Sequence, residues 1–271
     1  MIAKKYSLIL FFLLAYFISW VIWAPLWLPY FNITSLPVLP FHHAFGSIGP
    51  LLAAFIILWF EKGKSGVKQL VGRMFRWRVK PVWYAIALVG PFLLFGIALL
   101  INYFLTGEFR YQGIGVSKEF PQFGFLAFLA YNIATFGYGE ETGWRGYALP
   151  KLQNRFKALW ASMILTVGWA LWHVPLFLYR PGYTEMGFQD ILGWFISLLV
   201  GSILLTWLFN STRGSILIAA LFHATIDIAF TSDITNIQIV NYMGMLITVF
   251  GVAVLVMFKP KNLSIFERQK T

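Results

Sequence analysis

The sequence predicts an all-α, polytopic integral membrane protein with about eight transmembrane helices in one domain, residues 1–271. Three observations support this fold class. First, 59% of the 271 residues are hydrophobic and only 11% are charged, which is unlike a soluble domain. Second, the apolar residues form runs of about 17–25 residues, long enough to cross a hydrocarbon core about 30 Å thick as helices. Third, the basic residues are concentrated in alternate connections between these runs.

Eight apolar runs are long enough to be transmembrane helices. We place them at residues 6–28, 44–60, 82–105, 123–149, 158–179, 188–209, 214–230 and 237–258. Lys4 and Lys5 precede the first run, as in a signal peptide. That run is too long for a signal peptide and has no small-x-small cleavage site, so we expect it to be retained. Because we find no internal repeat or long linker, we expect a single membrane domain.

The basic residues predict how the chain is oriented. Of the 21 lysines and arginines, 18 lie near the two ends of the chain or in connections on the same predicted side as those ends. The other three are Arg110, Lys118 and Arg180. Basic residues are concentrated on the cytoplasmic side of membrane proteins, so we expect cytoplasmic termini and a location in the plasma membrane. This distribution explains the net charge of +11 through the lipid bilayer, without a nucleic-acid partner.

Cysteine is absent from the sequence. Disulfide bonds, thiolate nucleophiles and Cys-ligated zinc are therefore excluded. Any chemistry must use carboxylate, imidazole or hydroxyl groups.

Six ionisable side chains lie inside the predicted helices and away from their ends. They are Glu140, Glu141, Arg145, His173, His223 and Asp227. All six fall on three of the eight helices, and a rise of about 1.5 Å per residue puts them at overlapping depths. An ionisable group in hydrocarbon is costly and usually marks a functional site. We therefore predict that these three helices surround one polar cavity.

The adjacent glutamates are predicted to have different roles. Glu141 and Arg145 are four residues apart, so they can form an ion pair on one helix face. Glu140 is turned about 100° away and faces a different partner. We predict that Glu141 is structural and that Glu140 is available for chemistry. The alternative is an ion pair that only fixes helix packing, helped by the small residues Gly139 and Gly143.

The histidines are the other candidates for chemistry. His173 precedes Pro175, which should distort the helix, but His173 taken alone could be a core histidine bonded to a carbonyl. His223 and Asp227 share a helix face, and the carboxylate could fix the histidine tautomer, donate a hydrogen bond if protonated, or bind a metal. The remaining pair, at positions 42 and 43, is expected to lie in a loop.

Three motifs occur in order along the chain: Glu140-Glu141-x-x-x-Arg145, Trp169-x-x-x-His173 and His223-x-x-x-Asp227. Together they resemble the motifs of the CAAX-protease and bacteriocin-processing (CPBP or Abi) family of intramembrane proteases, which is related to the Ras-converting type of CAAX prenyl endopeptidase. The family core would be residues 123–230. In that family phenylalanine often replaces the tryptophan of the second motif, and asparagine is the usual last residue of the third.

The resemblance implies a peptide-bond hydrolase whose site is sunk in the membrane and opens to the cytoplasm. Glu140 would be the general base, and His173 would hold the attacking water. His223 and Asp227 would stabilise the oxyanion. Glu141 and Arg145 would shape the site.

The aspartate at position 227 leaves the mechanism open. An ionised aspartate only accepts hydrogen bonds and would repel an oxyanion. Asp227 is therefore protonated, or it orients His223, or the site holds a divalent metal. Glu140, His173 and His223 would be a possible zinc set by ligand type, although the His-Glu-x-x-His signature is absent. Both a metal-free and a metal-dependent reaction are compatible with the sequence.

We predict an intramembrane endopeptidase that hydrolyses a hydrophobic, lipidated or membrane-anchored peptide. Its role would be CAAX-type processing or bacteriocin maturation and immunity. One alternative is a proton-coupled transporter that uses the same carboxylates as a relay, although no repeat or paired broken helices support it. Another is a catalytically silent membrane immunity or scaffold protein.

Overall fold

A computed structural model describes residues 2–108 and 112–271. Within these ranges the regular secondary structure is helical, and no β-strand occurs apart from one isolated bridge between Ser117 and Ser232. The predicted all-α class is therefore confirmed.

The first half of the described chain forms six helical elements. They are α1 (Ile2–Ile22), α2 (Ala24–Trp27), η1 (Leu28–Phe31), α3 (His42–Ser47), α4 (Gly49–Met74) and α5 (Pro81–Thr106). The second half begins with a segment of five contiguous elements. They are α6 (Phe125–Asn132), η2 (Ile133–Tyr138), α7 (Gly139–Gly143), η3 (Trp144–Ala148) and α8 (Leu149–Gln153). The last five are α9 (Ala158–Trp172), η4 (Val174–Leu178), α10 (Phe188–Ser211), α11 (Ile216–Thr231) and α12 (Ile237–Asn262).

Five helices in the described part of the chain are long and apolar enough to cross a membrane. They are His42–Met74, Pro81–Thr106, Ala158–Leu178, Phe188–Ser211 and Ile237–Asn262. The bent pair Tyr6–Ile22 and Ala24–Phe31, with an angle of 59° between its parts, would give a sixth. Each of the eight predicted regions is helical, but α11 has only 16 residues and the region around the glutamates is divided among short elements. The predicted number of eight spans is therefore not confirmed.

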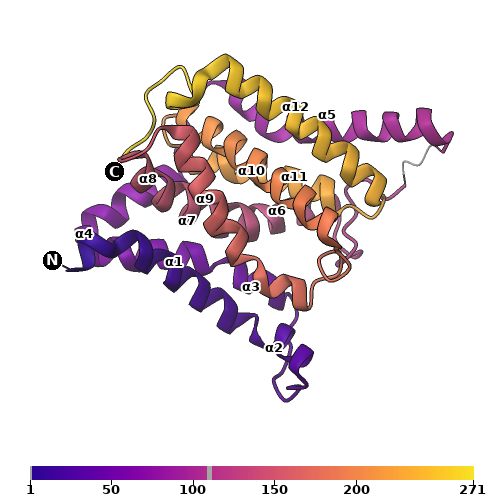
Figure 1. Ribbon diagram of the computed structural model, residues 1–271, viewed down its shortest axis with the longest axis horizontal. Helices are drawn as coiled ribbons and strands as arrows, with labels where there is room; N and C mark the ends of the chain where they lie inside the picture. The colour runs from indigo at the N-terminus through magenta and orange to yellow at the C-terminus, as the bar shows by residue number, and fades with distance from the viewer. Residues whose placement is uncertain (1, 109–111) are drawn as a thin grey trace.

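The helices are arranged in layers (Figure 1). Helices α5 and α12 lie together along one side of the molecule, and α1 and α4 lie along the other. Between them are α7, α9, α10 and α11. Both ends of the chain lie at the same end of the molecule. The outer surface carries large apolar side chains such as Leu93 and Phe104 of α5, as expected for helices that face lipid.

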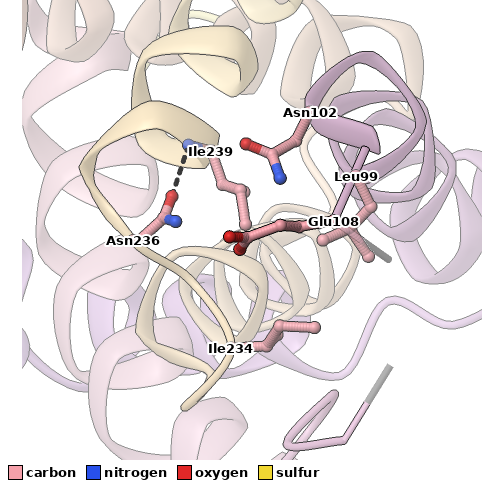
Figure 2. Close-up of a pocket in the computed structure, with 6 residues that line it drawn as sticks. All are labelled: Leu99, Asn102, Glu108, Ile234, Asn236 and Ile239. Carbon is pink, nitrogen blue, oxygen red and sulfur yellow. Dashed lines mark hydrogen bonds between the residues drawn. The ribbon is translucent and has the colours of Figure 1, made fainter. Parts of the chain in front are cut away.

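A small pocket lies outside the central layer, where the end of α5 meets the start of α12 (Figure 2). Its lining residues are Leu99, Asn102, Glu108, Ile234, Asn236 and Ile239. None of the six ionisable residues predicted to form the site contributes to it. We therefore assign it no part in the site described below.

The prediction that His42 and His43 lie in a loop is wrong. Both begin helix α3, and both are buried. His42 Nε2 lies 2.6 Å from the carbonyl oxygen of Ile22. His43 Nδ1 lies 2.6 Å from the hydroxyl oxygen of Tyr179. Because neighbouring segments supply these partners, the polar rings can be buried and the helix can begin at this point.

The segment with the glutamates is helical without interruption through residues 125–153, as predicted. Its α-helical part α7 is flanked by the π-helical segments η2 and η3. Such segments are rare and often occur at functional sites. Gly143 allows α7 to approach α4 closely, because a Cβ atom at this position would lie 2.5 Å from the backbone oxygen of Pro50.

Candidate active site

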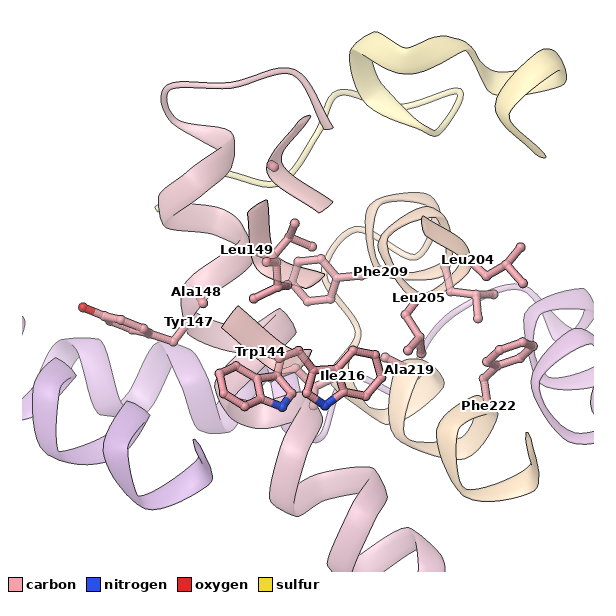
Figure 3. Close-up of a cluster of buried hydrophobic side chains, with 14 of the residues drawn as sticks. Trp144, Tyr147, Ala148, Leu149, Leu204, Leu205, Phe209, Ile216, Ala219 and Phe222 are labelled. Carbon is pink, nitrogen blue, oxygen red and sulfur yellow. The ribbon is translucent and has the colours of Figure 1, made fainter. Parts of the chain in front are cut away.

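A packed apolar core holds the helix that carries the glutamates (Figure 3). Trp144 and Tyr147 of η3 and Leu149 of α8 belong to the same buried cluster as Phe209 of α10 and Ile216 of α11. This cluster packs η3 and α8 against α10 and α11. The glutamates of the adjoining α7 are therefore positioned by packing as well as by their own hydrogen bonds.

The three helices predicted to share a cavity do meet, and they bring the six ionisable side chains together. Five of these side chains are buried, and Glu141 and Arg145 have no exposed surface at all. The exception is Asp227, whose side chain is 30% exposed. The site is therefore enclosed, and Asp227 lies at its edge.

Glu141 is held by two partners. Its Oε1 atom accepts a hydrogen bond from Arg145 Nη1 at 3.0 Å, which is the predicted pair. The same oxygen lies 2.8 Å from His223 Nδ1, a contact the sequence analysis did not identify. Arg145 Nη2 also donates to Ser202 Oγ of α10 at 3.1 Å. Glu141 thus links its own helix to α11 and, through Arg145, to α10.

His223 lies between two carboxylates. Because an ionised carboxylate can only accept, the contact with Glu141 requires a hydrogen on Nδ1. The other ring nitrogen, Nε2, lies 3.6 Å from Asp227 Oδ2, so the predicted shared face is present. This distance is longer than a hydrogen bond. Nε2 therefore has a carboxylate neighbour and can still bond to another group.

His173 directly follows α9, at the point where the chain changes conformation. The α-helix ends at Trp172 and continues as the 3-10 helix η4, which contains Pro175, so the predicted distortion is present. His173 Nδ1 lies 2.7 Å from the carbonyl oxygen of Trp169. A carbonyl oxygen only accepts, so Nδ1 carries the hydrogen, and the neutral ring has its lone pair on Nε2. The interpretation of His173 as a core histidine bonded to a carbonyl accounts for Nδ1. Nε2 stays available for another hydrogen bond.

Glu140 has a different environment from its neighbour. Its Oε2 atom accepts a hydrogen bond from the indole Nε1 of Trp169 at 2.7 Å. The predicted difference between the two glutamates is therefore visible in their partners: Glu141 bonds to Arg145 and His223, while Glu140 bonds to Trp169. This leaves Oε1 of Glu140 free of the protein bonds found among the described residues.

Two aromatic residues that the sequence analysis did not identify cover His173. The ring of Tyr183 is stacked on it, with centroids 6.3 Å apart and an interplanar angle of 11°. The ring of Trp194 meets it edge to face at 5.6 Å. Tyr183 lies in the connection between η4 and α10, so the sequence carried no periodic signal for its position. These rings close the site on the side of His173.

The candidate metal ligands do not fit a metal site. Among the described residues, no three histidine, aspartate or glutamate side chains are grouped as a metal ion would require. The hydrogen bonds of His173 Nδ1 and His223 Nδ1 do not themselves exclude a metal, because metal-bound histidines usually donate their other ring N–H to a carbonyl or a carboxylate. Since the described residues offer no such group of three ligands, the reaction derived below has no step through a metal.

Comparison with known proteins decides the family. A family model described as type II CAAX prenyl endopeptidase Rce1-like matches residues 121–229. A protein of Methanococcus maripaludis named CAAX prenyl protease 2 is 30% identical over 216 residues, which cover 74% of this chain and 76% of that protein. The chain belongs to the Rce1-like family of type II CAAX prenyl endopeptidases. The expected relationship to this group of proteases is confirmed.

The Rce1-like match and the site coincide. The matched region contains all six ionisable residues and extends from just before α6 nearly to the end of α11. The family and the apolar helices together show an integral membrane protein of the intramembrane protease class. A role in bacteriocin processing or immunity stays a prediction.

Proposed function

We propose that this protein is an intramembrane endopeptidase that cleaves near the carboxyl end of a prenylated or otherwise hydrophobic peptide, with Glu140 as the general base. The observation that carries the proposal is that the two buried glutamates have different hydrogen-bond partners. Glu141 is committed to Arg145 and His223, whereas Glu140 shares Trp169 with His173 and has one oxygen left for a reacting group. A general base needs such an uncommitted atom within reach of water.

The proposed reaction uses water activated between Glu140 and His173. Glu140 Oε1 takes one proton from the water, while His173 Nε2 accepts a hydrogen bond from it. The oxygen adds to the peptide carbonyl carbon and forms a tetrahedral intermediate. When the carbon–nitrogen bond breaks, Glu140 returns the proton to the leaving amine. General acid–base steps of this kind contribute about 10²–10⁴-fold to rates.

His223 is proposed to stabilise the oxyanion through Nε2. In this scheme both ring nitrogens carry hydrogen, and Glu141 and Asp227 balance the charge of the ring. Glu141 then acts as a positioning residue, because it holds Nδ1 and so fixes the direction in which Nε2 points. A donor held in place before the charge develops lowers the barrier without reorganisation.

The proposal is tested with purified protein and a farnesylated peptide that ends in a CAAX-type sequence. Glu140→Gln keeps the size of the side chain but removes the base, so we expect kcat to fall by about 10²–10⁴-fold. Glu185→Gln is the matched control, because Glu185 is exposed and lies in the connection between η4 and α10. It should retain the activity of the parent protein.

A second variant and a second substrate complete the test. His173→Gln should lose activity to a similar degree, because it cannot hold the water in the same way. An unprenylated hydrophobic peptide, such as a bacteriocin precursor, tests whether the prenyl group is required. Equal proteolysis by Glu140→Gln and the parent protein would show that Glu140 is not the base.

A further inference from the structure

Trp169 lies at the centre of the site, although it takes no part in the proton transfers of the proposed reaction. It is buried on α9, one helical turn before His173. Its ring is 5.5 Å from the ring of His223 and 5.8 Å from that of His173. The guanidinium carbon of Arg145 lies 4.8 Å from its ring centroid. One side chain therefore contacts residues from each of the three helices of the site.

Trp169 also holds both groups that are proposed to activate water. Its indole N–H donates to Glu140 Oε2, and its carbonyl oxygen accepts from His173 Nδ1. The carbonyl could belong to any residue at this position. Only tryptophan can supply the indole N–H, and in the described part of the chain this group is the only side-chain donor to Glu140.

The charges around Glu140 give this hydrogen bond its importance. Burial itself opposes the charge of Glu140, His223 acts on it as an opposite charge, and Asp227 and, more weakly, Glu141 act on it as like charges. Arg145 is bonded to Glu141 and to Ser202, so its hydrogen bonds are directed elsewhere. Like charges in a region of low dielectric oppose the ionised form of a carboxylate, and a hydrogen bond to the charged form favours it.

We propose that Trp169 is a positioning residue for Glu140, and that its indole N–H offsets the negative charge that Asp227 adds to the site. The proposal rests on Glu140 being the base. In this arrangement the indole fixes Oε2, so that Oε1 points to the water. It also keeps Glu140 able to accept a proton despite the nearby aspartate.

The first test compares two tryptophans on the same helix. Trp169→Phe keeps an aromatic ring but removes the donor to Glu140. Trp172→Phe is the matched control, because Trp172 is also buried and donates through Nε1, at 2.7 Å, to Ser19 instead. We expect Trp169→Phe to lower kcat about tenfold, at the lower end for a hydrogen bond to a charged group. Its KM should stay within about twofold, and Trp172→Phe should keep kcat within about twofold of the parent.

The second test repeats Trp169→Phe in protein that carries Asp227→Asn. If the indole offsets the charge of Asp227, the cost of Trp169→Phe should fall from about tenfold to less than about threefold in that background. Asp227 belongs to the proposed site, so the kcat of Asp227→Asn is expected to differ from that of the parent and serves as the reference in that background. An equal cost in both backgrounds, or a kcat of Asp227→Asn too low to measure, would overturn the inference.

These results separate the inference from the proposed function. If Glu140→Gln is fully active, the proposed function fails and the role of Trp169 fails with it. If Glu140→Gln is inactive while Trp169→Phe has the kcat of the parent, only the role of Trp169 is wrong. Equal losses in Trp169→Phe and Trp172→Phe would show that the ring acts through packing alone.

Discussion

At the scale of single residues, the site depends on a buried ion pair with incomplete bonding. Glu141 and Arg145 are fully buried and bonded to each other. Within the described part of the chain, Glu141 Oε2 and Arg145 Nε have no hydrogen-bond partner. Taking charges out of water is costly, so such a pair contributes less to stability than its short distance suggests. In the proposed reaction, the pair serves to hold His223 in position.

Removal of one member of this pair should be worse than removal of both. Glu141→Leu leaves the Arg145 charge buried without its partner, so we expect a loss of about 3–5 kcal/mol in the free energy of unfolding. The double variant Glu141→Leu, Arg145→Met should recover much of this loss, because neither charge is left alone. Denaturant unfolding in detergent measures both. Equal stability of the single variant and the parent would show that the arginine finds another partner.

Activity should not follow stability in this pair. Both variants remove the acceptor for His223 Nδ1, so both should have low kcat even where the double variant is stable. A double variant with parental kcat would show that Glu141 has no positioning role.

At the scale of helices, the sequence predicted contacts within a helix better than contacts between helices. The pairs Glu141–Arg145 and His223–Asp227 follow from a spacing of four residues, and both are present. The bond from Trp169 to Glu140 depends on how two helices are rotated about their axes. The π-helical segments beside α7 change that rotation, and the spacing of the hydrophobic residues in the sequence does not indicate where such segments occur. The contact between His223 and Glu141 could not be predicted for the same reason.

The same limit explains the error at His42 and His43. Their partners, Ile22 and Tyr179, lie far away in the sequence. Polarity at the edge of an apolar run therefore predicted a loop, where the structure has a buried helix start.

Close packing of α7 against α4 gives a test at this scale. In Gly143→Ala the new methyl group would lie 2.5 Å from the backbone oxygen of Pro50, so the helices must move apart. We expect a loss of about 1–3 kcal/mol in the free energy of unfolding, and lower activity because the glutamates move with the helix. Gly201→Ala is the control, because no atom outside its own helix neighbourhood lies within 4 Å of the added Cβ atom. It should be neutral or more stable by about 0.5–1 kcal/mol.

Tolerance of Gly143→Ala, with stability and activity equal to those of Gly201→Ala, would contradict this prediction. It would mean that α4 and α7 are not held at the distance seen here. The role of the glycine would then be limited to backbone flexibility.

At the scale of the whole molecule, the site lies away from the chain ends. His173 follows the end of α9, and Asp227 is in the last part of α11. The connection with Tyr183 covers this side, while the chain ends lie at the other end of the bundle (Figure 1). The distribution of basic residues predicts cytoplasmic termini, and the resemblance implied a site that opens to the cytoplasm. Asp227 is the exposed edge of the site, so the two expectations disagree if a peptide enters at that edge.

The absence of cysteine makes the orientation directly measurable, because every introduced thiol is the only one in the chain. Ser65 and Thr184 are exposed hydroxyl residues in opposite parts of the bundle, the first in the basic region of α4 and the second in the connection near the site. The asymmetry in basic residues is strong, so we expect the side with Ser65 to face the cytoplasm. A membrane-impermeant maleimide should then label Thr184→Cys in intact cells and label Ser65→Cys only after the cells are opened. The reverse pattern would place the site on the cytoplasmic side and show that the basic residues do not set the orientation here. Either pattern fixes the side of the membrane on which Asp227, the exposed edge of the site, lies.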